Sequence, residues 1–114
     1  MLFRSLSKGA GDEEFLDVLD RVLLQLSGYS FDLLFFQAGV DGLKMDGLGL
    51  LNLSREGMRE RNEKVFKWRR ELGIPMLLFM GGGYSDPIDH TVDAFADLFF
   101  GAAKEYRLAL AGGG

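Results

Sequence analysis

Two short apolar runs, separated by a segment long enough for a helix, constrain the fold of this chain more than any other feature. The first run is "FDLLFFQAG" at residues 31–39, and the second is "IPMLLFM" at residues 74–80. Runs of this length between turn residues are typical of strands buried on both faces. Because a long crossover joins them, we predict parallel strands in a right-handed βαβ unit. The predicted class is α/β, a three-layer α/β/α arrangement with a parallel sheet and helices on both faces.

Three amphipathic segments are predicted to be helices. The first follows Asp12 as its N-cap, has apolar residues recurring every three or four positions, and is ended by the turn residues 27–30. The second covers residues 55–72 and is bounded by a capping Ser54 and a terminating Gly73. The predicted order is therefore helix, strand, helix, strand, helix.

The third predicted helix starts near Pro87, which suits a first helical turn, and ends near Tyr106. Its inward face is predicted to consist of Val92, Phe95, Ala96, Phe99 and Phe100. Residues 110–114 are predicted to be a disordered tail. All 114 residues are assigned to one domain.

Two glycine-rich segments follow the two predicted strands. Residues 39–53 read "GVDGLKMDGLGLLNL", a long irregular connection of the kind that often carries function. Residues 81–87 read "GGGYSDP". Ligands of parallel sheets bind beyond the carboxyl ends of the strands, so Asp41 and Tyr84 are predicted to face one crevice. The glycines would let the backbone pass close to a ligand and carry Tyr84 over it.

Composition excludes several classes of function. The net charge of −4 argues against nucleic acid as a partner, since nucleic-acid-binding surfaces are basic. No apolar stretch is long enough to predict a membrane span. The sequence has no cysteine, which is consistent with a cytoplasmic protein and excludes thiolate metal ligands. It has one histidine, His90, so a metal site made by these residues would depend mainly on carboxylates.

Two long motifs resemble the histone deacetylase superfamily, the zinc-dependent amidohydrolases of the arginase/deacetylase fold. They are "FDLLFFQAGVDGLKMDGLGLLNLSREGMRERNEKVF" and "GIPMLLFMGGGYSDPIDHTVDAFADLF". They lie in the family's order and spacing, and the likeness covers roughly residues 8–103. It is nearest to class IV enzymes and their bacterial relatives.

The resemblance implies a role for each matching residue. Asp41 matches the aspartate that ligates the catalytic zinc. Tyr84 matches the tyrosine whose hydroxyl stabilises the oxyanion, and Gly82 and Gly83 match glycines lining the acyl tunnel. Zinc in such a site polarises the acyl carbonyl and activates water. The implied substrate is an acylated lysine or another acylated amine.

The sequence also departs from the family pattern. Met45 stands where the family has glycine, and Gly47 where it has arginine or proline, whereas Asp46 matches a family aspartate that we interpret as structuring the loop. The family's Asp-x-His zinc motif and its paired histidines lie upstream of the matching segment, and residues 1–11 contain neither aspartate nor histidine. His90 lies where the family has no zinc ligand. A catalytic zinc needs about three protein ligands.

The resemblance therefore implies the C-terminal part of a deacetylase, with weak or absent zinc binding and little activity on its own. The partner would be a missing N-terminal fragment, or a second copy pairing through an exposed edge strand. Two alternatives remain open: a non-catalytic α/β module for binding or assembly, and a small nucleotide- or anion-binding domain. The glycine triplet lacks both the G-x-G-x-x-G spacing and the Lys-Ser/Thr of a phosphate-binding loop, which disfavours the second alternative.

Overall fold

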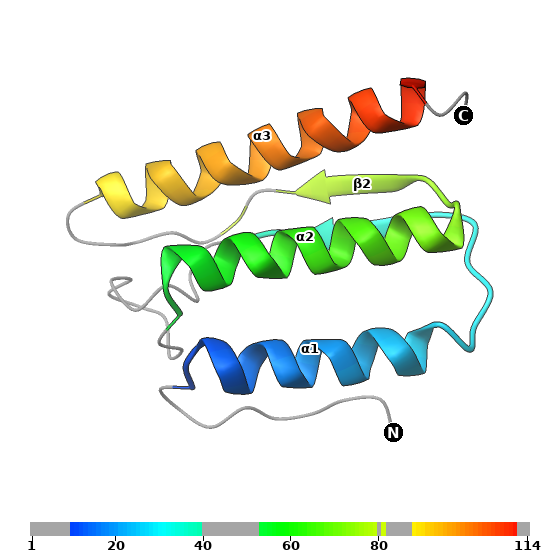
Figure 1. Ribbon diagram of the computed structural model, residues 1–114, viewed down its shortest axis with the longest axis horizontal. Helices are drawn as coiled ribbons and strands as arrows, with labels where there is room; N and C mark the ends of the chain where they lie inside the picture. The colour runs from blue at the N-terminus through cyan, green and yellow to red at the C-terminus, as the bar shows by residue number, and fades with distance from the viewer. Residues whose placement is uncertain (1–9, 40–52, 80, 82–87, 112–114) are drawn as a thin grey trace.

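The computed structural model describes residues 10–39, 53–79, 81 and 88–111. The elements in chain order are α1 (Asp12–Leu26), β1 (Leu34–Gln37), α2 (Arg55–Leu72), β2 (Met76–Phe79) and α3 (Asp89–Ala111). Figure 1 shows them in the order predicted from the sequence. The α/β class is therefore confirmed.

The two strands form a parallel sheet, as the crossover length predicts. Leu34 pairs with Met76 and Gln37 pairs with Phe79. One further backbone hydrogen bond continues the pairing at the carboxyl end, where the amide of Ala38 donates to the carbonyl of Phe79 at 2.9 Å. Both strands therefore finish at the same level of the sheet.

Helix α2 has the boundaries and caps that its sequence predicts. Ser54 is the N-cap, and its hydroxyl accepts a hydrogen bond from the amide of Gly57 at 2.9 Å. Gly73 ends the helix with φ of 70°, a left-handed conformation that favours glycine. Both signals are local, and the structure confirms both.

The N-cap predicted for α1 is wrong. The cap is Gly11, without a side-chain hydrogen bond, and Asp12 is the first residue of the helix. The carboxylate of Asp12 instead accepts hydrogen bonds from Ser54. A long-range partner has thus replaced the local capping role.

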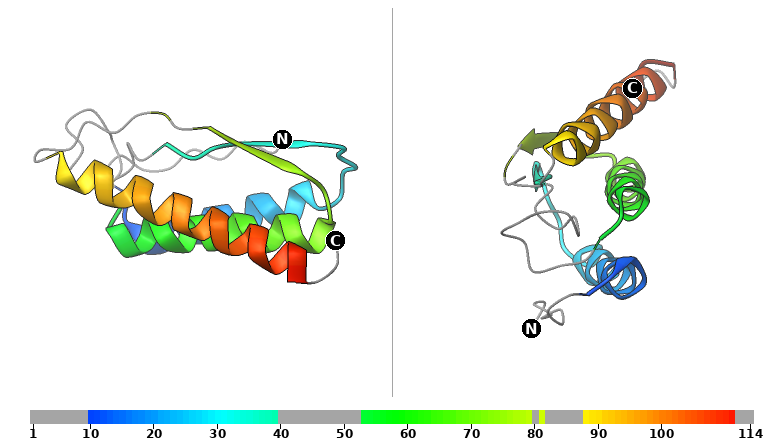
Figure 2. Two further views of the ribbon diagram at one scale, coloured as in Figure 1. Left: turned by 90° about the horizontal axis from the view of Figure 1, so that it is seen from above. Right: turned by 90° about the vertical axis from the view of Figure 1, so that its left-hand side faces the viewer.

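The helices cover one face of the sheet. Figure 2 shows all three on the same side of the two strands, with α2 between α1 and α3. Two connected clusters form the core: Leu53, Met58 and Ala94 with Phe15 and Phe95, and Ala38, Phe66 and Leu98 with Phe36, Met76 and Leu78. The described residues therefore form two layers, and the predicted third layer is not confirmed.

The other face of the sheet is exposed. Phe35 is 64% accessible, Leu77 49% and Phe79 41%, and the rings of Phe35 and Phe79 stack with centroids 5.6 Å apart. The prediction that both faces of the strands are buried is therefore wrong for this chain. Side chains alternate between the faces of a strand, and the helices cover only the face that carries Phe36, Met76 and Leu78.

Helix α3 differs from its prediction in length and in orientation. It extends past Tyr106 to Ala111, so residues 110 and 111 are helical, whereas residues 112–114 lie outside the described residues. Val92, Phe99 and Phe100 were predicted to face inward and are exposed, Phe100 by 73%.

The buried stripe of α3 consists instead of Thr91, Ala94 and Leu98, and Phe95 and Ala96 are half-buried. Gly101 continues this stripe, and a Cβ built there would lie 3.1 Å from Cε2 of Phe66. The close approach of Phe66 leaves little room for a larger side chain at position 101. Phe95 packs against the core, whereas Phe99 and Phe100 lie on the exposed side of the helix.

Candidate functional site

The carboxyl ends of β1 and β2 define the candidate site. Gln37 and Phe79 are paired neighbours, so the chain leaves both strands at one edge of the sheet. Asp41 follows the first strand by four positions, and Tyr84 follows the second by five. A crevice shared by these two residues requires that both strands end at the same edge, and the parallel pairing meets this requirement.

The predicted site residues themselves lie outside the described residues. This applies to Asp41, Gly82, Gly83 and Tyr84, and also to residues 45–47 and Pro87. Gly81, the first residue of the glycine triplet, is described and half-buried. A Cβ at Gly81 would lie 3.3 Å from Nε2 of Gln37, so the start of the triplet passes close to the end of β1.

Arg61 of α2 reaches the end of β1 from the face of the sheet that the helices cover. The residue is only 8% exposed, and its Nη1 donates a hydrogen bond to the carbonyl of Gly39 at 2.6 Å. Nη2 lies 3.4 Å from the carbonyl of Ala38, a longer and weaker contact. Arg61 therefore binds the last described backbone groups before residues 40–52.

Neighbouring side chains orient this guanidinium. Nε and Nη2 of Arg61 donate to Oδ1 of Asn62 at 3.1 and 2.8 Å, and Cζ lies 5.4 Å from the centroid of the Phe36 ring. Contact with an aromatic face is favourable for a guanidinium. Hydrogen bonds and ring contact together fix the plane of the side chain.

A second charged group holds the chain where residues 40–52 end. The amide of Ser54 donates to Oδ1 of Asp12 at 2.8 Å, and the Ser54 hydroxyl donates to Oδ2. Asp12 belongs to α1 and Ser54 is the N-cap of α2, so this contact joins the two helices. Both ends of the segment that carries Asp41 are therefore anchored by polar side chains.

An ion pair holds α3, the helix that follows the Tyr84 segment. Arg55 Nε lies 2.6 Å from Asp97 Oδ2, and Arg55 Nη2 lies 2.9 Å from Asp97 Oδ1. Hydrogen bonding to Arg55 holds the pKa of Asp97 below its usual value, and the same bond raises the pKa of Arg55. The first residue of α2 is thereby tied to α3.

The sequence interpretation missed Arg61 and the role of Asp12. A signal for Arg61 exists in the pattern of α2, because Met58, Val65 and Phe66 define its buried face. Positions 61 and 62 fall on this face at helical spacing, so a charged residue there indicates a specific polar partner. No comparable signal links Asp12 to Ser54.

The described residues do not contain a complete metal site. Among them, no three or more His, Asp or Glu side chains gather closely enough to hold an ion, and His90 is exposed at the start of α3. In the described part of the chain, no helix has the length and apolar character needed to cross a membrane.

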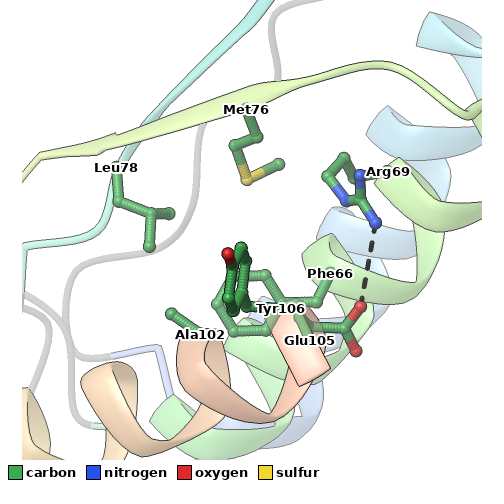
Figure 3. A pocket seen from close by; sticks show the side chains of 7 residues that line it. All are labelled: Phe66, Arg69, Met76, Leu78, Ala102, Glu105 and Tyr106. Atoms are coloured by element: carbon green, nitrogen blue, oxygen red, sulfur yellow. Dashed lines mark ion pairs between the residues drawn. The ribbon is translucent and has the colours of Figure 1, made fainter. Parts of the chain in front are cut away.

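The described residues also form a pocket of about 240 Å³ between β2, α2 and α3 (Figure 3). It lies beside Met76 and Leu78, the two residues of β2 that face the helices. Its carboxylate, Glu105, is paired with Arg69 at 3.9 Å and with Arg70 at 3.1 Å. The lining residues are Phe66, Arg69, Met76, Leu78, Ala102, Glu105 and Tyr106.

Comparison with known proteins identifies relatives. Residues 2–98 match the histone deacetylase domain family. Over 77 residues the chain is 40% identical to Histone deacetylase 2 of Arabidopsis thaliana, a match covering 67% of this chain and 20% of that protein. Over 88 residues it is 34% identical to an uncharacterised protein of Picosynechococcus, covering 76% of this chain and 29% of that protein. The chain thus spans less than a third of the length of these relatives.

Proposed function

The chain belongs to the histone deacetylase family, and from this premise we propose that it supplies part of a zinc-dependent amidohydrolase site. The observation that carries the proposal is the parallel ladder, which ends β1 and β2 side by side at Gln37 and Phe79. The segments containing Asp41 and Tyr84 both start from this edge.

In this proposal Asp41 is one zinc ligand and Tyr84 donates a hydrogen bond to the oxyanion that develops on the acyl group. When bound, zinc would supply the positive charge that polarises the acyl carbonyl and activates water. Gly82 and Gly83 line the channel for the acyl chain, where the absence of side chains leaves room for it. The substrate is an acylated lysine or another acylated amine.

We also propose that this chain corresponds to the C-terminal part of a class IV-like or bacterial deacetylase domain of three layers. The match to a minor share of each relative supports this, as does the exposed face of Phe35, Leu77 and Phe79. The remaining zinc ligands would come from outside the 114 residues, which alone would bind zinc weakly and show little activity. A cytoplasmic location is proposed from the cysteine-free sequence.

The proposal is tested by exchanging the matched segment of the Arabidopsis relative for the corresponding residues of this chain. We expect the chimera to hydrolyse an acetyl-lysine peptide and the isolated chain to be nearly inactive. Asp41→Asn and Tyr84→Phe should each abolish most of the chimera's activity. The matched controls, Asp32→Asn and Tyr29→Phe, change exposed residues and should leave it unchanged. An active parent enzyme with an inactive chimera would contradict the proposal.

A second candidate function is non-catalytic assembly through the sheet. The exposed face of Phe35, Leu77 and Phe79 favours it, and within the described residues each strand has one edge without a strand partner. Such a face and such edges are suited to a second copy or a complementing fragment. An inactive chimera, together with concentration-dependent association of the isolated chain that Phe35→Lys abolishes, would favour assembly over catalysis.

A further inference from the structure

We propose that Arg61 is a positioning residue that fixes the backbone where the chain leaves β1 toward Asp41. Its effect on catalysis rests on the proposed function, whereas its effect on the end of β1 does not. The inference comes from the contacts of the guanidinium with Gly39 and Ala38, the last described residues before residues 40–52.

The contacts of this helix side chain reach backbone acceptors beyond the end of a strand. The ladder of β1 stops at Gln37, and among the described residues the amide of Ala38 makes the last backbone bond to β2. The carbonyls of Ala38 and Gly39 face Arg61 instead. Arg61 therefore provides hydrogen bonds to the backbone at the point where strand pairing ends.

The chemistry of arginine suits this task better than a simple packing role. Burying a cation is costly unless hydrogen bonds compensate, and an apolar residue would fill the same space at lower cost. The planar guanidinium carries five donors in a fixed fork, so it can hold successive carbonyls and Asn62 in one arrangement. Lysine offers a point charge on a flexible stem and lacks this fork.

The position of Asp41 makes the hydrogen bonds from Arg61 relevant to the candidate site. It is two residues after Gly39, so the direction of the chain at Gly39 limits where its carboxylate can lie. A displacement of about 1 Å at a catalytic group can cost about a hundredfold in rate. Arg61 would act through this backbone and would not contact the substrate.

The experiment measures hydrogen exchange of two amides at opposite ends of β1. The Leu34 amide donates to the carbonyl of Pro75 at 3.0 Å, and the Ala38 amide to that of Phe79 at 2.9 Å. In the full 114-residue chain, Arg61→Lys should accelerate exchange at Ala38 about tenfold, the effect of losing a charge-assisted hydrogen bond. Exchange at Leu34 should change less than about twofold, since a local change leaves the far end of the strand intact.

Arg59→Lys is the matched control, because Arg59 is an exposed arginine of the same helix that pairs with Glu56. It should alter neither amide. If Arg61→Lys does not fold, Asn62→Ala replaces it, since this change removes the Oδ1 acceptor of the guanidinium and should accelerate exchange at Ala38 alone. Equal acceleration at both amides, or none, would overturn the proposal by showing a general structural role or no role.

The active chimera supplies the catalytic readout. Arg61→Lys should lower kcat by about tenfold or more with a smaller change in KM, and Arg59→Lys should not. If the chimera is inactive, the proposed function fails, and exchange at Ala38 still decides whether Arg61 holds the strand end. If Ala38 exchanges faster but kcat is unchanged, the positioning role in catalysis is refuted.

Discussion

Replacing Gly57 by alanine should destabilise this protein, although the same change stabilises most helices. Gly57 lies in the first turn of α2, and its amide donates to the hydroxyl of Ser54. A Cβ built at Gly57 would lie 2.1 Å from Oδ1 and 2.4 Å from Cγ of Asp12. The carboxylate that anchors the end of residues 40–52 would therefore have to move.

The size of the effect follows from these distances. Oδ1 would retreat by more than about 1 Å to reach ordinary contact, which stretches its 2.8 Å bond from the Ser54 amide beyond hydrogen-bonding range. Losing the bonds from Ser54 to the charged Asp12 should cost about 2–3 kcal/mol. Better helix propensity returns up to about 1 kcal/mol. The net loss in the free energy of unfolding should be about 1–2 kcal/mol.

The decisive test repeats the change in an Asp12→Ala background. The three atoms nearest the built Cβ all belong to the Asp12 carboxylate, so Gly57→Ala should now stabilise by up to about 1 kcal/mol. Urea unfolding followed by circular dichroism measures all four proteins of the cycle. Asp17→Ala removes an exposed acid of α1 and is the control, in which Gly57→Ala should still destabilise. The same sign of effect in both backgrounds would refute the reasoning.

Three further predictions concern other parts of the fold. Asp97→Asn should lower the free energy of unfolding at pH 6, and the difference from the parent protein should shrink as the pH falls from about 4. Arg55 lowers the folded-state pKa of Asp97, so the stabilisation is lost as that carboxylate protonates. Urea titrations at several pH values check this, and a pH-independent difference would contradict it. Gly73→Ala should cost about 1 kcal/mol in the same assay, because only glycine adopts a φ of 70° without strain, and no loss would argue against this C-cap. Leu98→Ala should cost about 2–5 kcal/mol because Leu98 is fully buried, and a cost under about 1 kcal/mol would show that the core differs from this description.

Local signals in the sequence predicted the order of elements well. Two apolar runs gave the strands, and the capping residues Ser54 and Gly73 gave both ends of α2. At these positions the local signals and the tertiary contacts agree, whereas the equally local capping signal of Asp12 was overridden by its bond to Ser54. The shared edge of the candidate site followed from the same reasoning, since parallel strands have their carboxyl ends at the same edge of the sheet.

The features that sequence reasoning missed depend on distant residues. Asp12 bonds Ser54 across 42 positions, and Arg61 bonds Gly39 across 22. Apolar spacing correctly placed Phe95 on the inward face of α3 but not Phe99 and Phe100. Spacing alone could not show that Phe66 approaches α3 at the small Gly101. Burial of both strand faces could not be inferred from apolar composition alone, because it depends on which elements cover the sheet.

Helix α2 connects the two anchors of the candidate site. Its N-cap, Ser54, holds the end of residues 40–52 through Asp12, and Arg61 holds their beginning through Gly39. Arg61 follows Ser54 by seven positions, about 10 Å along the helix at ~1.5 Å per residue. Because α2 carries both anchors, we expect a shift of this helix to move both ends of the segment together. The packing of Phe66 against Ala38 and Leu98 therefore affects the candidate site through the position of α2.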